Sequence, residues 1–120
     1  MAEMPASVLI VDDHAGFRLS ARRILEADGY EVVGETHDGR SAIAASRRLR
    51  PDIVLLDVHL PDLDGFEVAR ELTAEPGAPA IVLTSSHDSE DFGDSVPRSR
   101  AAGFVPKHEL CGAAVAALVA

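Results

Sequence analysis

Short apolar runs alternate with longer stretches of helical spacing along the chain. The segment Ser7–Val11 is almost wholly apolar, and residues 52–57 read DIVLLD, which is the clearest strand pattern in the sequence. Shorter runs at residues 31–33, 79–84 and 103–105 complete a set of five predicted strands. Continuous apolar runs of this length are typical of strands that are buried on both faces of a parallel sheet.

Helical patterns follow these strands. We predict helices from the Asp12-Asp13 pair to Gly29, over residues 41–49, over residues 66–72 with Asp64 as the cap, and over residues 109–120. Residues 87–100 fit a helix poorly because Gly93 and Pro97 interrupt them, so we expect only a shortened helix that begins near Pro97. Five strand–helix units with right-handed crossovers predict an α/β fold, doubly wound, with a parallel sheet in the order 2-1-3-4-5.

Composition narrows the class of protein. The chain has 120 residues and 47% hydrophobic content, from which we expect a single domain over residues 1–120 with no output domain on this chain. The net charge of −9 argues against direct nucleic-acid binding and against an anionic membrane surface. The single cysteine, Cys111, is expected to pack within the last helix. With neither a signal peptide nor a membrane span in the pattern, we expect a cytoplasmic protein.

Polar residues stand where the predicted strands end. They are Asp12, Asp13, Asp57, Thr84, Ser85 and Lys107. Because the carboxyl ends of parallel strands open onto one edge of the sheet, and the first and third strands are neighbours, three carboxylates converge there. A cluster of hard oxygen ligands suits Mg²⁺. Asp57, on the central strand, is the best-placed carboxylate to accept a phosphoryl group, whose charge an ammonium group and the metal would offset.

In this order and at these separations, the residues resemble the receiver domain of two-component response regulators, most of all those that carry a helix-turn-helix output domain. The motifs that carry the resemblance are Asp12-Asp13, DVHLPDLDG around Asp57, Leu83-Thr84-Ser85, and GFVPK ending at Lys107. The resemblance implies that Asp57 is the phosphoacceptor of a phosphorylation-controlled signalling switch, served by a sensor histidine kinase.

The resemblance also implies a role for each matching position. Asp13, Asp57 and the backbone carbonyl of His59 would ligate Mg²⁺, and Asp12 would act mainly through water. Thr84 and Phe104 would form the switch pair, that is, the two side chains that respond to phosphorylation. Lys107 would bind the phosphoryl group. His59 and Ser86 would modulate hydrolysis of the acyl phosphate. Such a protein is not a conventional enzyme, although it catalyses its own Mg²⁺-dependent phosphorylation and dephosphorylation.

Partner surfaces follow from the same resemblance. The first helix would dock the kinase, with Arg18, Arg22 and Arg23 as candidate contacts. The fourth helix, fifth strand and fifth helix would form a homodimer surface. Because the match is poorest over residues 87–100, we expect that segment to be mobile or displaced and standard dimerisation to be weakened.

Other interpretations stay open at this point. A pseudo-receiver would bind partners without phosphorylation, and a Mg²⁺-dependent phosphohydrolase would share the acidic edge, although the sequence after Asp57 lacks the DxDxT-like signature. A flavodoxin-like carrier of flavin mononucleotide is set aside, because Asp12 and Asp13 would repel the phosphate of the bound flavin. All five histidines fall at or just after a predicted strand end, which fits solvated loop residues or, alternatively, pH sensing or transition-metal binding. They are His14, His37, His59, His87 and His108.

Overall fold

A computed structural model describes residues 6–87 and 89–119. The elements in chain order are β1 (Ser7–Val11), α1 (Ala15–Ala27), β2 (Glu31–Thr36), α2 (Gly39–Leu49), β3 (Ile53–Asp57), α3 (Gly65–Thr73), β4 (Ala80–Ser85), η1 (Ser89–Phe92), α4 (Ser95–Arg98), β5 (Gly103–Pro106), η2 (Lys107–Glu109) and α5 (Gly112–Val119). The strands form one parallel sheet in the order β2-β1-β3-β4-β5. The predicted fold class and strand order are therefore confirmed.

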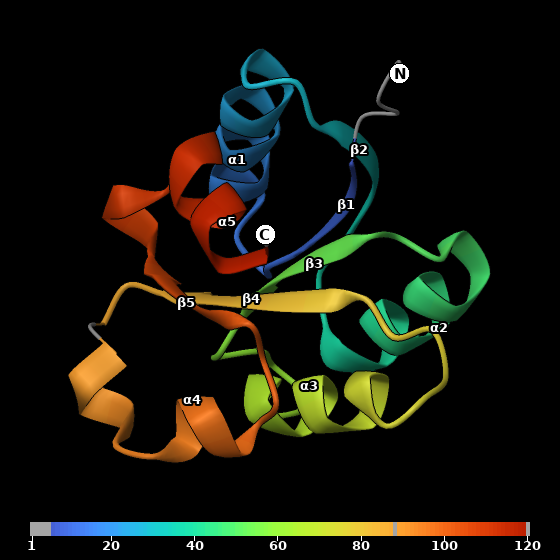
Figure 1. Cartoon of the computed structure of the whole chain (residues 1–120), viewed down its shortest axis with the longest axis vertical. Coiled ribbons are helices and arrows are strands. Elements are labelled where there is room, and N and C mark those ends of the chain that lie inside the picture. The colour runs from blue at the N-terminus through green and yellow to red at the C-terminus, as the bar shows by residue number, and fades with distance from the viewer. Residues whose placement is uncertain (1–5, 88, 120) are drawn as a thin grey trace.

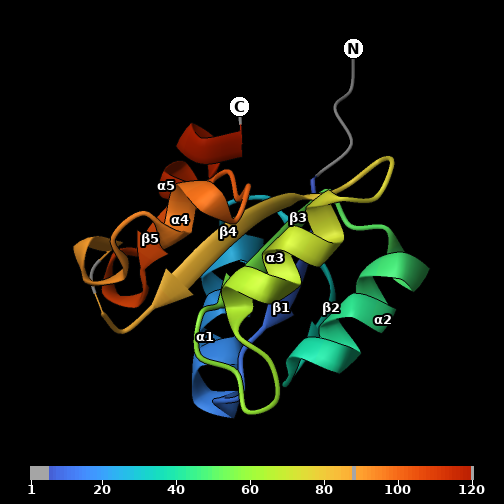
Figure 2. The ribbon, with the colours of Figure 1, turned by 90° about the horizontal axis from the view of Figure 1, so that it is seen from below.

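The sheet is covered by helices on both faces. Figure 1 shows α1 and α5 on one side of the sheet and α2, α3 and α4 on the other, and Figure 2 views the molecule from the side of α2, α3 and α4. Side chains of β1 alternate between two hydrophobic clusters, with Val8 and Ile10 in the cluster under α1 and α5, and Leu9 and Val11 in the opposite one. Burial on both faces explains why the strands read as continuous apolar runs. Within the described ranges, no helix combines the length and apolarity that a membrane crossing requires.

The strand register brings the polar strand ends together. Val11 pairs with Leu56, so Asp12 and Asp57 each follow one member of that pair on adjacent strands. On the other side of β3, Asp57 pairs with Thr84. The sheet therefore places the candidate chemistry at a single edge, as the strand order predicts.

The last helix begins later than its pattern predicts. Leu110 is extended, with φ −63° and ψ 124°, and α5 starts only at Gly112. Cys111 precedes the helix, its side chain is exposed, and its Sγ accepts a hydrogen bond from the Ala114 backbone N–H at 3.4 Å. The expectation that Cys111 packs inside the helix is therefore wrong. The Asp28 carboxylate accepts the Gly112 backbone N–H at 2.7 Å and so fixes where the helix starts.

The segment after β4 is broken into two short pieces. η1 ends at Phe92, Gly93 has a φ of +57°, and α4 spans only four residues with Pro97 as its third. The expectation of a shortened helix near Pro97 is confirmed, although the helix starts two residues earlier. Positive φ at Gly93 is a conformation that a residue without Cβ adopts freely, so glycine allows this break. The expected mobility of residues 87–100 stays a prediction.

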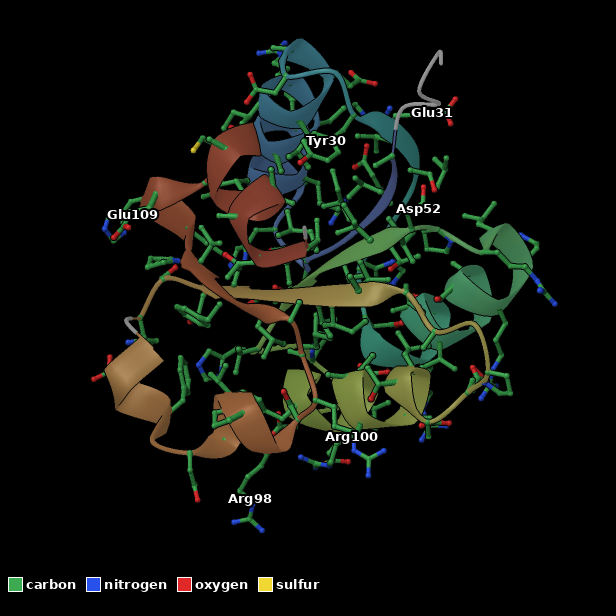
Figure 3. The ribbon with its side chains drawn as sticks, viewed as in Figure 1. Tyr30, Glu31, Asp52, Arg98, Arg100 and Glu109 are labelled. Atoms are coloured by element: carbon green, nitrogen blue, oxygen red, sulfur yellow. The ribbon has the colours of Figure 1, made fainter. Side chains whose placement is uncertain are left out.

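Arg100 ends this segment in the left-handed region, with a φ of 67°. Its side chain is exposed, and Figure 3 shows Arg98 and Arg100 on the outer side of the helical layer, pointing away from the sheet. A Cβ makes this conformation unfavourable, whereas glycine adopts it without strain. The strain therefore comes from the backbone at Arg100 and not from a lost side-chain contact.

We predict that Arg100→Gly stabilises the protein. Relief of the left-handed strain, less the extra chain entropy of glycine, should raise the free energy of unfolding by about 0.5–1 kcal/mol in urea denaturation.

The matched control is Arg98→Gly, because Arg98 is also exposed but lies within α4. Glycine at a helical position should lower the free energy of unfolding by about 1 kcal/mol. Equal destabilisation by both substitutions would show that the backbone at Arg100 is not strained.

Candidate functional site

A pocket of about 220 Å³ opens at the carboxyl edge of the sheet. Its walls come from the last residues of β3 and β4 and from the segments that follow β1, β3, β4 and β5. The lining residues are Asp13, His14, Asp57, His59, Ser85, Ser86, His87 and Lys107. Thr84 and Phe104 are not among them, since Thr84 is buried within β4 and Phe104 lies half-buried on β5.

Two carboxylates at this edge are buried beside a single lysine. Asp12 is 0% and Asp57 3% exposed. The Lys107 Nζ lies 2.7 Å from Asp12 Oδ2 and 3.5 Å from Asp57 Oδ2. The same ammonium group stands 4.6 Å from the centre of the Phe17 ring, so an aromatic face on α1 helps to hold it. Because buried charges need partners, Lys107 is the group that makes this carboxylate pair tolerable.

The Asp57 carboxyl is the strongly perturbed acid of the pocket. Burial, reinforced by the neighbouring Asp12 carboxylate, raises its pKa from 3.8 to about 6. Lys107 and the His59 backbone N–H, which donates to Asp57 Oδ1 at 3.2 Å, oppose that rise and limit it. Near neutral pH the carboxylate is still mostly ionised, but its buried charge lowers the stability of the folded state.

A group of possible ligand atoms surrounds this charge. Asp12, Asp13, His14 and Asp57 each offer one atom, and these atoms all lie within 4.8 Å of one another. Three carboxylates against one ammonium leave an excess of about two negative charges, which a divalent cation would neutralise. The oxygen donors therefore fit Mg²⁺, and the coarse expectation of an acidic magnesium-type site is met by Asp12, Asp13 and Asp57.

Thr84 presents a hydroxyl that nothing in the described residues satisfies. Its side chain is 0% exposed, and its Oγ1 has no hydrogen-bond partner there. A buried polar atom without a partner is unfavourable, so such an atom beside a ligand pocket points to a bound group that completes it. Because Thr84 and Asp57 are register partners on adjacent strands, their side chains leave the same face of the sheet.

The loop after β3 holds the pocket through glycine and backbone contacts. The Val58 N–H donates a hydrogen bond to the Thr84 carbonyl at 3.0 Å, and the Gly65 N–H donates one to the Val58 carbonyl at 2.8 Å. A Cβ on Gly65 would collide with the Asp57 carbonyl oxygen and lie 2.7 Å from the Val58 Cα. Gly65 ends the DVHLPDLDG motif, but the motif alone does not indicate what this glycine does. A residue that permits close backbone approach leaves no signal in periodicity or charge.

Asp62 and Arg18 are two further positioning residues that the sequence did not reveal. The Asp62 carboxylate accepts the Gly39 and Arg40 backbone N–H groups at 2.7 and 3.0 Å, and so ties the loop after β3 to the start of α2. Arg18 donates to the Asp12 carbonyl at 2.6 Å. The sequence suggested Arg18 only as an exposed kinase contact, since a long-range hydrogen bond has no sequence signature.

Three of the five histidines reach the pocket. His14, His59 and His87 line it, and the rings of His59 and His87 lie 5.7 Å apart in an edge-to-face arrangement. His37 instead lies 3.5 Å from Asp38, and His108 lies 3.3 Å from Glu109. Ser86 lines the pocket with an exposed side chain, next to the buried Ser85.

Comparison with known proteins gives one consistent result. A family model described as the response regulator receiver domain matches residues 8–117. The transcriptional regulatory protein PdtaR of Mycobacterium tuberculosis is 38% identical over 102 residues, which are 85% of this chain and 48% of that protein. A protein-glutamate methylesterase/protein-glutamine glutaminase of Hahella chejuensis is 39% identical over 89 residues, 74% of this chain and 25% of that protein.

Solved structures agree in fold. A LuxR-family two-component response regulator from Aurantimonas superposes with a TM-score of 0.85 at 33% identity, covering 96% of this chain and 86% of that one. The chain spans about half the length of the first curated relatives it matches, with 48–50% coverage of each.

The raised pKa of Asp57 predicts an unusual pH dependence of stability. An acid whose pKa is raised by folding binds its proton more tightly in the native state, so stability is lost as pH rises from 3.8 to about 6. Removing the charge by Asp57→Asn should therefore raise the free energy of unfolding by about 3 kcal/mol at neutral pH, and the gain should shrink toward zero near pH 4. Urea denaturation of the native protein and of Asp57→Asn, in metal-free buffer at several pH values, measures this difference in the free energy of unfolding.

Asp62→Asn is the control, because we expect it to change the free energy of unfolding in the opposite direction. Burial acts to raise the pKa of Asp62, but hydrogen bonds from the Gly39 and Arg40 backbone outweigh it and lower that pKa. Its neutralisation should destabilise the protein at neutral pH. If Asp57→Asn also destabilises the protein, the prediction is wrong, and the interactions of the buried Asp57 carboxylate fully offset the unfavourable effect of burying its charge.

Proposed function

This chain belongs to the response regulator receiver domain family of two-component systems, and we propose that it is a phosphorylation-controlled signalling switch with Asp57 as its phosphoacceptor. The observation that carries the proposal is the buried Asp57 carboxylate, shared between Lys107 and a metal-type acidic cluster beside the unsatisfied Thr84 hydroxyl. The proposed partner is a sensor histidine kinase in the cytoplasm.

Asp57 is the nucleophile in this proposal. One carboxylate oxygen forms a bond to phosphorus while the bond from phosphorus to the donor's histidine nitrogen breaks, which leaves an acyl phosphate on the protein. Burial raises the free energy of the ionised carboxylate, and a pKa of about 6 keeps it mostly ionised near neutral pH. The His59 backbone N–H holds Oδ1, so the carboxylate is oriented before the reaction.

Lys107 and Thr84 receive the phosphoryl oxygens. The Lys107 ammonium already lies 3.5 Å from Asp57 Oδ2 and can neutralise added negative charge. The Thr84 hydroxyl, which has no hydrogen-bond partner among the described residues, would donate to a phosphoryl oxygen. When bound by Asp13, Asp57 and the His59 carbonyl, with Asp12 acting through water, Mg²⁺ would supply further charge neutralisation. Phe104 would respond as the partner of Thr84 in the switch.

The partner surfaces are proposed on two faces. On α1, Arg18 and Arg22 pair with Glu35, while Leu19 is 49% exposed and Arg23 is exposed beside it, which suits docking of a kinase. The homodimer surface of α4, β5 and α5 contains a helix of only four residues, so we propose that dimerisation through it is weak.

No feature of the described residues favours the pseudo-receiver alternative. A pseudo-receiver needs no buried acceptor, no lysine beside it and no unsatisfied hydroxyl, yet all three stand together here. Maintaining Asp12 and Asp57 in a buried pair destabilises the fold, which is hard to explain without a chemical role.

Incubation with Mg²⁺ and acetyl phosphate tests the proposal directly. We expect intact mass spectrometry to show a gain of one phosphoryl group in the native protein and none in Asp57→Asn, because only the carboxylate can form the acyl phosphate.

Asp64→Asn is the matched control, since Asp64 lies in the same loop and accepts the Phe66 N–H as a helix cap. It should still take up the phosphoryl group. A native protein that gains no mass, but forms a stable complex with beryllofluoride at Asp57, has a short-lived phosphate; one that does neither is a pseudo-receiver.

His59→Ala should change the rate of dephosphorylation and leave Mg²⁺ affinity unaltered. The His59 side chain lines the pocket, while its proposed metal contact is a backbone carbonyl that alanine retains. Decay of the phosphorylated protein, followed by mass, gives the rate, and magnesium titration gives the affinity. His37→Ala, outside the pocket, should change neither, and an unaltered decay rate in His59→Ala would remove the assigned role.

A further inference from the structure

We propose that Phe92 is a positioning residue that sets the lifetime of the phosphorylated state. Its ring holds the His59 imidazole at the rim of the pocket, where the imidazole limits the approach of water to the acyl phosphate on Asp57. The inference rests on the proposed function, since it needs a phosphoryl group on Asp57. It adds a residue that does not line the pocket and acts only through its neighbour.

Aromatic rings gather beside the pocket in a chain that has few of them. Of the four phenylalanines in the sequence, Phe66, Phe92 and Phe104 belong to the hydrophobic cluster on the side of α2 and α3. The Phe92 ring contacts both of the others, with ring centres 5.5 Å from Phe66 and 5.7 Å from Phe104. It also contacts His59 at 5.8 Å, so Phe92 joins this cluster to the lining of the pocket.

The His59 ring is held by two aromatic neighbours. The His87 ring meets it at 5.7 Å with an angle of 77° between the ring planes, and the Phe92 ring meets it at 5.8 Å with an angle of 50°. These tilted and edge-to-face arrangements are the ones that aromatic pairs prefer. The His59 backbone N–H bonds to Asp57, whereas its exposed side chain makes only these ring contacts within the described ranges. Loss of the Phe92 ring would therefore free the imidazole to move.

Hydrolysis of the acyl phosphate needs a water molecule at the phosphorus. The water oxygen forms a bond to phosphorus while the bond from phosphorus to the Asp57 oxygen breaks, which restores the carboxylate and leaves both water protons on inorganic phosphate. The pocket is small, about 220 Å³, and His59 is part of its lining. An imidazole that is fixed there occupies space that water would otherwise enter, so a fixed ring slows hydrolysis and a freed ring accelerates it.

The break after β4 determines where the Phe92 ring lies. η1 ends at Phe92, and Gly93 turns the chain with a φ of +57° before α4 begins at Ser95. Phe92 is half-buried and packs against the hydrophobic cluster under the helical layer. The irregular segment therefore supplies one ring to the rim of the pocket, which gives the break a role in the lifetime of the phosphorylated state.

The test compares decay of the phosphorylated state in the native chain, Phe92→Leu, Phe92→Tyr and Phe66→Leu. Each protein is phosphorylated with acetyl phosphate and Mg²⁺, separated from the acetyl phosphate and followed by intact mass. Leucine keeps apolar packing but lacks the ring, so decay in Phe92→Leu should be about threefold faster or more. Tyrosine keeps the ring and should retain the native rate. Phe66→Leu is the matched control, because Phe66 contacts Phe92 but no histidine among the described residues, and its decay should stay within about twofold of native.

A double-mutant cycle separates positioning from a general loss of packing. If Phe92 acts through His59, adding Phe92→Leu to His59→Ala should leave the decay rate of His59→Ala unchanged. In NMR spectra of the unphosphorylated protein, the ring proton signals of His59 should shift in Phe92→Leu and much less in Phe66→Leu, because only the first substitution removes a ring in contact with His59. Magnesium titration should give the same affinity throughout, since no substitution changes a proposed ligand atom.

Two results would overturn the inference in a protein that is phosphorylated on Asp57: a native decay rate in Phe92→Leu, or an acceleration by Phe92→Leu that persists in full beside His59→Ala. Either result leaves the proposed function intact. A native acyl phosphate too short-lived to detect, in a protein that still binds beryllofluoride, also overturns it, because no barrier to water is then present. A protein that neither gains a phosphoryl group nor binds beryllofluoride loses both proposals.

Discussion

The arrangement of this molecule depends on two buried carboxylates that share one ammonium group. Asp12 and Asp57 stand at the ends of adjacent strands, where Lys107 reaches both. The buried carboxylate pair is tolerated only while the Lys107 ammonium group is held beside it, because an uncompensated buried charge destabilises the fold by several kcal/mol. Phe17 on α1 and the turn after β5 hold that partner, so the charges connect elements that are far apart in sequence.

The rest of the fold supplies the rigidity that this arrangement requires. Strands that are apolar on both faces bury the sheet between two helical layers, and their register leaves little freedom in where Asp57 and Thr84 emerge. Gly65 lets the following loop return against the backbone of β3, and Asp62 ties that loop to α2. The pocket is therefore formed by backbone geometry before any ligand binds, which lowers the reorganisation that phosphoryl transfer would need.

Sequence reasoning found the sheet and its polar edge because both have short-range signals. Continuous apolar runs predict buried strands, and parallel strands predict where Asp57, Thr84 and Lys107 gather. It failed where a contact between distant segments decides local structure. The Asp28 carboxylate sets the start of α5, and so leaves Cys111 exposed outside the helix. The fold, and not the sequence, also shows which of the histidines at the strand ends line the pocket, namely His14, His59 and His87.

The broken segment after β4 is joined to the pocket through aromatic packing. The ring of Phe92 lies 5.8 Å from His59, 5.5 Å from Phe66 and 5.7 Å from Phe104. A regular fourth helix would distribute its packing over several turns, whereas here a single residue of η1 contacts both His59 at the rim of the pocket and Phe104 on β5. Because packed interiors resist continuous deformation, a displacement of the His59 or Phe104 ring must be accommodated at Phe92. The broken segment is thus in direct aromatic contact with His59 at the pocket that holds Asp57.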